Sequence, residues 1–90
     1  MYCVYLLQDS KGQYYIGQTK NIQKRLELHN RGLVRSTKHR RPLSLVGVEK
    51  HNSVSEARWR EYTLKKSAFQ RQRFINKLSR GSLTRREQQC

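Results

Sequence analysis

The sequence is poor in acidic residues and cysteine, and it contains no long hydrophobic run. Six Asp and Glu stand against 20 Lys and Arg in a chain of 90 residues. No apolar run approaches the roughly 18 residues of a membrane-spanning helix, so we expect no membrane partner. Lys11 and Gly12 interrupt the first apolar segment early, which argues against a secretory leader. The expected location is therefore cytoplasmic, or associated with a nucleoid or nucleus, and not secreted.

The few cysteines and histidines do not form a zinc-binding pattern. Cys3 and Cys90 lie near opposite ends of the chain, and neither has a second ligand at the short spacing typical of zinc sites. The histidines, at positions 29, 39 and 51, are scattered as well. The sequence therefore does not predict structural zinc, and two cysteines fit a reducing compartment.

The excess of basic residues is the strongest compositional signal. The formal net charge is +14 at pH 7. A field of that sign attracts polyanions and speeds their encounter with the protein, so nucleic acid is the first partner to consider. The alternative is a basic surface that only improves solubility, or one of the ribosomal type. Ninety residues also suffice for one domain with a modest core, without a separate targeting domain.

The first part of the chain predicts a β-hairpin. Apolar runs over residues 2–8 and 14–19 flank a polar turn that contains Gly12. The first run is apolar on both faces apart from its tyrosines, as a central strand would be. Tyr5 and Tyr15 share parity, so an odd-numbered loop places them on one face of the sheet, whereas a four-residue loop separates them. A site that uses both tyrosines requires the odd loop.

A helix is expected next, over residues 21–30. Asn21 is a suitable N-cap, and Gly32 follows the expected end of the helix. Arg25 and His29 are four residues apart and therefore share a helical face. Taken alone, His29 could be a buried ring bonded to a backbone carbonyl, and Arg25 a solvated cation. Together with two phenols, they indicate a site that handles phosphate.

A basic loop over residues 31–42, closed by Pro42, precedes a third strand over residues 43–48. The charged or titratable residues of this loop are Arg31, Arg35, Lys38, His39, Arg40 and Arg41. Such a run is usually solvated or mobile. Beside a phosphate-handling site it favours a track for the nucleic-acid backbone, which positions a substrate without reading its sequence.

A second helix is expected to begin at a capping box formed by Ser53 and Glu56, so we assign Glu56 a structural role. Its predicted apolar stripe contains a carboxylate and consists of Val54, Ala57, Glu61, Leu64 and Ala68. A buried carboxylate is costly unless it meets a cation or a hydrogen-bonding network. Glu61 is therefore either the partner of an arginine or a ligand for a divalent ion such as Mg²⁺, which commonly takes only one or two carboxylates.

Two aromatic residues of this helix, Trp59 and Tyr62, flank the stripe. We expect them to be packing residues rather than platforms on which bases stack. A last helix is expected over residues 69–78, and a flexible basic tail over residues 81–90, outside a domain of residues 1–80. The predicted fold class is α/β, more narrowly α+β. A small three-stranded antiparallel sheet is flanked by about three helices in the order β-β-α-β-α-α.

These residues also carry a family resemblance. Residues 3–5 read Cys-Val-Tyr, residues 15–17 read Tyr-Ile-Gly, and Arg25, His29 and Glu61 follow in order. In this order and spacing they resemble the GIY-YIG nuclease domain, over about residues 2–78, in its small single-domain branch. The second motif is intact. The first keeps only its tyrosine, because cysteine and valine replace glycine and isoleucine.

The resemblance implies a metal-dependent endonuclease that hydrolyses DNA phosphodiester bonds. The catalytic residues would be Tyr5, Tyr15, Arg25, His29 and Glu61. Glu61 would hold Mg²⁺ or Mn²⁺, because the family's metal-binding glutamate lies on the corresponding helix. Arg25 would clamp the phosphate, and either tyrosine, helped or replaced by His29, would take the proton of the attacking water. A cationic surrounding would lower the pKa of that tyrosine.

Further residues are expected to bind the substrate, namely Gly17, Arg35, Lys38, His39, Arg40 and Asn76. No helix suited to reading bases in a groove is evident, so sequence specificity should be weak. The preferred form of DNA, whether single-stranded, duplex or branched, stays open, and a targeting protein partner is plausible. The rival interpretation is a basic nucleic-acid-binding module without catalysis, which the degenerate first motif favours slightly.

Overall fold

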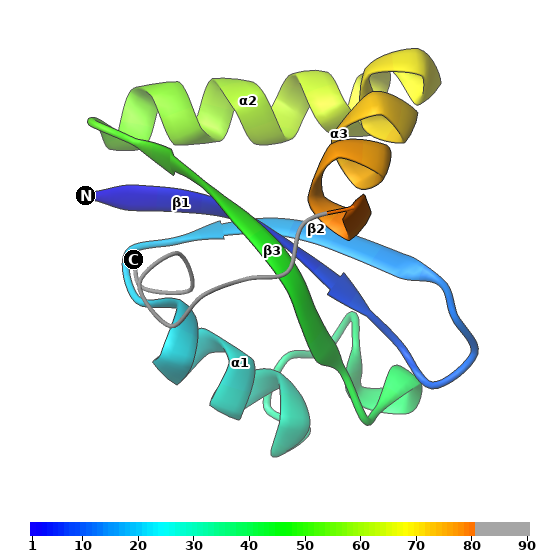
Figure 1. The fold of residues 1–90 in the computed structure, drawn as a ribbon. Coiled ribbons are helices and arrows are strands. Elements are labelled where there is room, and N and C mark those ends of the chain that lie inside the picture. The colour runs from blue at the N-terminus through cyan, green and yellow to red at the C-terminus, as the bar shows by residue number, and fades with distance from the viewer. Residues whose placement is uncertain (81–90) are drawn as a thin grey trace.

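A three-stranded antiparallel sheet lies between helices in the computed structural model, which describes residues 1–80 (Figure 1). Its elements are β1 (Tyr2–Gln8), β2 (Tyr14–Thr19), α1 (Ile22–Asn30), a short 3-10 helix (Lys38–Arg40), β3 (Ser44–His51), α2 (Val54–Lys66) and α3 (Ala68–Arg80). The predicted α+β class and the order β-β-α-β-α-α are confirmed. The expected basic tail, residues 81–90, lies outside the described residues.

The strand order is β2-β1-β3, so β1 is central, as its apolar character predicts. Gln8 and Tyr14 form the last pair of the hairpin, and the loop is therefore residues 9–13, an odd number. Tyr5 lies opposite Gly17, and Tyr15 lies opposite Leu7. Both tyrosines consequently point to the same face, which is the condition for a joint site.

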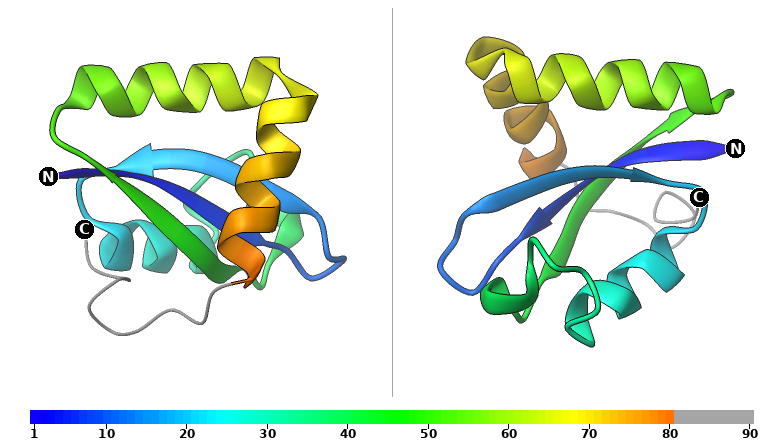
Figure 2. Two further views of the ribbon diagram at one scale, coloured as in Figure 1. Left: turned by 45° about the horizontal axis from the view of Figure 1, so that its top comes forward. Right: turned by 180° about the vertical axis from the view of Figure 1, so that it is seen from behind.

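The two faces of the sheet carry separate parts of the core. On one face, Val4 and Leu6 pack with residues of α2 and α3, among them Leu64 and Phe74. On the opposite face, Tyr5 and Leu7 pack with Ile22 of α1 and with Leu43. The ribbons show α2 and α3 on one side of the sheet and α1 on the other (Figures 1 and 2). Because β1 is covered on both faces, residues 3–7 are all buried.

Local capping explains where α1 begins and ends. The side chain of Asn21 accepts a hydrogen bond from the Lys24 amide at 3.1 Å, so the helix itself begins at Ile22. Gly32, with φ of 78°, follows its end, and the Gly32 N–H donates to the carbonyl of His29 at 3.1 Å. The Asn30 amide group then bonds both backbone groups of Leu43, at 2.7 and 2.9 Å. That pair ties the end of α1 to the chain just before β3.

The second half of the chain corrects several sequence-based boundaries. Leu43 belongs to the core but not to the third strand, which runs over Ser44–His51. Ser53 and Glu56 form the predicted cap at 3.2 Å, and the Glu56 carboxylate accepts from the Asn52 N–H at 3.3 Å. The stripe of α2 does not reach Ala68, because α2 ends at Lys66 and Ala68 opens α3, where it is exposed.

No helix in residues 1–80 is long and apolar enough to cross a membrane.

The prediction that Trp59 and Tyr62 are packing residues is wrong. Their exposed fractions are 67% and 52%. The inward face of α2 is narrow, with Ala57 and Leu64 as its buried residues, and the two aromatic residues lie outside it. They stack on each other instead, with ring centroids 5.7 Å apart and an interplanar angle of 23°.

Candidate active site

A buried chain of hydrogen bonds joins β1, α1 and the basic loop beneath the sheet. The Tyr5 hydroxyl lies 3.0 Å from His29 Nε2 and accepts a hydrogen bond from Arg25 Nε at 3.4 Å. On the other side of the imidazole, His29 Nδ1 lies 2.7 Å from Thr37 Oγ1. Tyr5, His29 and Thr37 are each at most 1% exposed, so bulk solvent has little access to these groups.

The donor and acceptor of each hydrogen bond follow from the groups at the two ends of this network. Thr37 Oγ1 donates to the Val34 carbonyl at 3.4 Å, which makes this oxygen an acceptor for His29 Nδ1–H. His29 Nε2 is then an acceptor, and the Tyr5 hydroxyl donates to it. This tautomer is inferred from the network. The hydrogen bonds therefore all run the same way, from the Arg25 side chain at one end to the Val34 carbonyl at the other.

The sequence left open that His29 is a buried ring bonded to a backbone carbonyl, but no backbone carbonyl is the partner of this ring within residues 1–80. Two hydroxyl groups, from Tyr5 and Thr37, hold the ring instead. Thr37 is a hydrogen-bond partner of His29 that is not among the site residues expected from the sequence. Its only signal in the sequence is its place in the basic loop, and the folding of that loop against α1 brings it to His29.

Burial sets the protonation states of the Tyr5–His29 pair. It raises the pKa of Tyr5 to about 12, although the hydrogen bond from Arg25 acts in the opposite direction. At Tyr5, burial therefore outweighs the lowering of the pKa that the neighbouring Arg25 produces. Burial, assisted by the charge of Arg25, lowers the pKa of His29 to about 4. Near neutral pH the resting pair is a neutral phenol beside a neutral imidazole.

The depressed pKa of His29 predicts a loss of stability in mild acid. The pKa in the folded protein lies below the ordinary value of 6.5, so unfolding takes up a proton between the two values. The stabilisation is complete above pH 6.5 and is lost as the pH falls toward 4. It amounts to at most about 3 kcal/mol, because one pKa unit corresponds to about 1.4 kcal/mol.

Urea unfolding of the wild type and His29→Gln between pH 7 and 4.5 measures this effect. The variant should be less stable at pH 7, because it loses the buried bonds to Tyr5 and Thr37. Its disadvantage should shrink on acidification, since glutamine does not titrate. A difference that is constant with pH would mean that His29 does not bind a proton in this range.

Tyr15 lies at the outer edge of this cluster and is half-buried. Its ring centroid is 6.3 Å from that of Tyr5 and 5.2 Å from that of His29. Lys65 Nζ lies over the same ring, 5.6 Å from its centroid. The rings of Tyr5 and Tyr15 therefore lie close together on one face of the sheet, as the odd loop predicts. Tyr15 also connects the α1 side of the sheet to α2.

The close approach at Gly17 is to Tyr5. A Cβ atom added to Gly17 would meet the hydroxyl of Tyr5 and would lie 2.5 Å from Tyr5 Cζ. Gly17 lies within β2, directly opposite Tyr5, and its φ is not positive. The absence of a side chain at this position therefore lets the Tyr5 ring lie over the neighbouring strand.

Glu61 approaches the cluster from α2, on the other side of the sheet. Its charge raises the pKa of both Tyr5 and Arg25. The side chain is 26% exposed, so it is less buried than the sequence suggested, and its ion pair is with Lys65 at 3.5 Å rather than with an arginine. An open pocket lies alongside and is lined by Tyr14, Tyr15, Ile16, Lys65 and Arg71. The carboxylate thus stands beside a basic recess at the edge of β2.

The donor set at Glu61 restricts how a divalent ion can bind. Within residues 1–80 there is no group of three or more His, Cys, Asp or Glu side chains that could hold a metal ion. A single carboxylate supplies at most two oxygen ligands. Mg²⁺ accepts such a site when water and substrate phosphates complete its coordination shell. The residues therefore fit an ion that Glu61 shares with the substrate, and not a cage built from protein ligands alone.

The expected substrate-binding residues fall into separate groups. Arg35, Lys38 and His39 are exposed on the basic loop. Arg40 has partners within the protein, because its Nε lies 2.8 Å from Asp9 Oδ2 and its Nη2 lies 3.0 Å from the Tyr14 carbonyl. These contacts tie the basic loop to the hairpin.

Asn76 lies apart from the residues around Tyr5. Its side chain is exposed, and its Oδ1 accepts a hydrogen bond from Gln72 Nε2 at 3.0 Å, one turn earlier on α3. That helix packs against β3 rather than against the edge strand β2. Among the expected catalytic residues, the fold therefore assembles Tyr5, Tyr15, Arg25 and His29 closely, with Glu61 at their border.

Comparison with known proteins identifies the family of this chain. The profile of the family described as "GIY-YIG catalytic domain" matches residues 1–74. The chain belongs to the GIY-YIG family, and its domain implies a nuclease-type activity on nucleic acid. The family resemblance noted in the sequence is thereby confirmed.

Relatives within this family are small UPF0213 proteins. UPF0213 protein SSP2268 of Staphylococcus saprophyticus is 39% identical over 79 residues, which cover 87% of this chain and 94% of the relative. A UPF0213 protein of Staphylococcus aureus is 44% identical over 63 residues, which cover 69% of this chain and 77% of that relative. The solution NMR structure of UPF0213 protein BH0048 from Bacillus halodurans has 28% identity and a TM-score of 0.55, covering 98% of this chain and 93% of its own.

Proposed function

We propose that this protein is an endonuclease that hydrolyses DNA phosphodiester bonds with low sequence specificity and depends on Mg²⁺ or Mn²⁺. The observation that carries the proposal is the convergence of Tyr5, Arg25 and His29 in one buried hydrogen-bond chain. Glu61 and a basic recess border that chain. An arginine, a proton-transfer pair and a carboxylate supply the groups that hydrolysis of a phosphodiester requires.

Arg25 would bind the scissile phosphate. Its Nε donates to Tyr5, which orients the guanidinium, while the terminal nitrogens can donate to phosphate oxygens in parallel. A lysine could not reproduce both contacts, because its ammonium is a single point of charge. Arg25 would thereby couple the position of the phosphate to the position of the Tyr5 hydroxyl.

Tyr5 and His29 form a path for the proton of the attacking water. Tyr5 would accept that proton while passing its own to His29 Nε2, so that the imidazole becomes the final acceptor. The low pKa of the resting imidazole opposes this step, and the negative charge of a bound phosphodiester favours it. Tyr15, which is less buried, is the alternative acceptor for the water proton.

Glu61 would hold the divalent ion together with water and the substrate. When bound, the ion supplies Lewis-acid stabilisation of the charge that develops on the phosphate and on the leaving oxygen. The ion pair with Lys65 leaves Glu61 close to a cation that can itself bind a phosphate. Hydrolysis in this arrangement would leave a 5′-phosphate and a 3′-hydroxyl, as in the family.

The exposed basic loop would guide the DNA backbone. Arg35, Lys38 and His39 are its accessible contacts, and Arg40 supports the loop from within. Gly17 would contribute by accommodating Tyr5, and Asn76 could contact only a more distant part of the substrate. Contacts of this kind hold phosphates without reading bases, which is the reason for expecting weak sequence specificity.

A second candidate function is nucleic-acid binding without cleavage. The observation that favours it is Cys3, which stands where the family's first motif has glycine and is fully buried in the central strand. In this case the basic loop would bind DNA as a module of a larger assembly, brought there by a protein partner. Retention of all five expected catalytic residues favours the nuclease.

Cleavage assays with and without metal distinguish the two functions. Labelled single-stranded, duplex and branched DNA are incubated with the protein in Mg²⁺, in Mn²⁺ or in excess EDTA. We expect cleavage in both metals and none in EDTA, with products that carry 5′-phosphates. Binding of DNA without cleavage of any form in either metal would support the binding module instead.

A further inference from the structure

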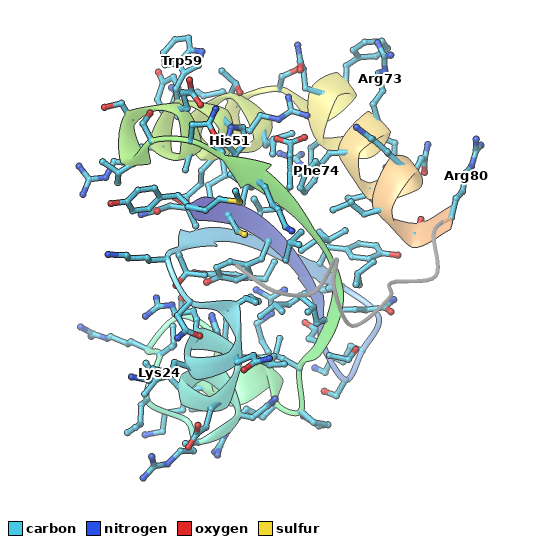
Figure 3. All side chains as sticks on the ribbon, turned by 60° about the vertical axis from the view of Figure 1, so that its left-hand side comes forward. Lys24, His51, Trp59, Arg73, Phe74 and Arg80 are labelled. Carbon is cyan, nitrogen blue, oxygen red and sulfur yellow. The ribbon has the colours of Figure 1, made fainter. Side chains whose placement is uncertain are left out.

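A pair of exposed aromatic residues stands out on the outer side of α2. Trp59 and Tyr62 stack on each other, and Lys66 Nζ lies over the Tyr62 ring, 5.5 Å from its centroid. We name Trp59, Tyr62 and Lys66 the aromatic ridge. Trp59 projects away from the sheet at the surface of the molecule (Figure 3). Single exposed aromatic residues are common, but a stacked pair with a cation indicates a surface that binds something.

The ridge begins next to the candidate active site. At about 100° per residue, Tyr62 is turned by about 100° from Glu61 around the axis of α2, and Trp59 by about 60° more in the same direction. Tyr62 therefore lies between the carboxylate at the site and the tryptophan at the outer surface. A strand that leaves the recess beside Glu61 and crosses α2 meets Tyr62 first and Trp59 next.

Charge complementarity identifies the kind of partner. Arg58 and Lys65 are exposed on the same helix between Glu61 and the ridge, and Lys66 belongs to the ridge. The acidic side chains of α2 have partners within the protein, since Glu56 caps the helix and Glu61 pairs with Lys65. Aromatic faces interleaved with cations bind single-stranded nucleic acid, because bases stack on the rings while phosphates meet the cations.

We propose that Trp59 and Tyr62 form a stacking platform for unpaired bases of the strand that leaves the active site across α2. The inference rests on the proposed nucleic-acid substrate, but it does not require cleavage. Bases in a duplex stack on each other and are not available to such a platform. The ridge therefore favours single strands or single-stranded flanks of branched DNA, which gives the protein selectivity for strand form without reading sequence.

Intrinsic fluorescence provides a direct test, because Trp59 is the single tryptophan of the chain. The wild type is titrated in EDTA with single-stranded oligothymidylate of about 15 nucleotides, within the usual site size of such surfaces. Stacking of a base on the indole should quench the emission as the complex forms. A duplex of the same length should bind with much less quenching.

Two substitutions separate stacking from hydrophobicity. We expect Trp59→Leu to bind labelled oligothymidylate about tenfold more weakly than the wild type, because it loses a stacked base. Trp59→Phe keeps an aromatic face and should retain most of the affinity. Duplex affinity should be the same for all three proteins, and circular dichroism should show equal folding, since Trp59 is mostly exposed.

Several results would overturn the platform. One is saturation with oligothymidylate without quenching, and another is equal affinity of Trp59→Leu and the wild type. A third is self-association that Trp59→Leu abolishes in sedimentation, since a second copy would then cover the ridge. Quenching without cleavage in Mg²⁺ or Mn²⁺ would overturn the nuclease alone, whereas cleavage without quenching would overturn the platform alone.

Discussion

Glu61→Gln is expected to reduce DNA cleavage by about a hundredfold or more while DNA binding persists. The substitution removes the carboxylate charge with little change in shape, so the site loses the ligand that would hold a divalent ion. Lys65, the ion-pair partner of Glu61, stays available for phosphate. Cleavage is measured under single-turnover conditions in Mg²⁺ and Mn²⁺, and affinity is measured separately in EDTA.

Glu56→Gln is the matched control, because it makes the same chemical change on the same helix. Glu56 caps α2 and lies away from the recess, and glutamine also satisfies a capping box. Its cleavage rate should equal that of the wild type. If Glu61→Gln cleaves at the rate of Glu56→Gln, the ion is held elsewhere, and Glu61 serves as the structural partner of Lys65.

Gly17→Ala is expected to destabilise the fold by about 2 kcal/mol, as overpacking of a filled site does. The added Cβ would lie 2.5 Å from Tyr5 Cζ, and the ring has little room to move because Tyr5 is 1% exposed. Displacement of the ring would also break its bonds to His29 and Arg25. Cleavage should therefore fall together with the free energy of unfolding in urea.

A double-mutant cycle identifies the source of this loss. In a Tyr5→Ala background the ring is absent, so Gly17→Ala should cost much less stability than in the wild type. Gly47→Ala is a milder control, because its Cβ would meet Leu78 Cβ at 3.0 Å on the opposite side of the sheet. Equal costs of Gly17→Ala in the two backgrounds would show that contact with Tyr5 is not the cause.

Features that depend on neighbouring residues were predictable from the sequence. The hairpin, the Asn21 cap and the capping box at Ser53 all appear where local patterns indicate them. The shared face of Arg25 and His29 follows from helical periodicity alone. The two caps and the shared helical face involve groups within four residues of each other, and the hairpin joins two strands that adjoin in the sequence, so short-range geometry determines these features.

Other features depended on groups that are distant in the sequence. Loop parity decided that Tyr5 and Tyr15 share a face, and the sequence left both parities open. The contact of Thr37 with His29 requires the basic loop to fold back on α1, where the pair of Arg40 with Asp9 pins it. Neither contact has a signature in local pattern or propensity.

The sequence by itself determined the fold class, the family and the residue types of the site, because periodicity and motif order are properties of the chain. The tertiary structure alone decided the protonation states of Tyr5 and His29, since their pKa values depend on burial between β1 and α1. It also decided that Trp59 is exposed and not packed. Burial is set by the packing of distant elements, and periodicity within one helix does not specify how wide its covered face will be.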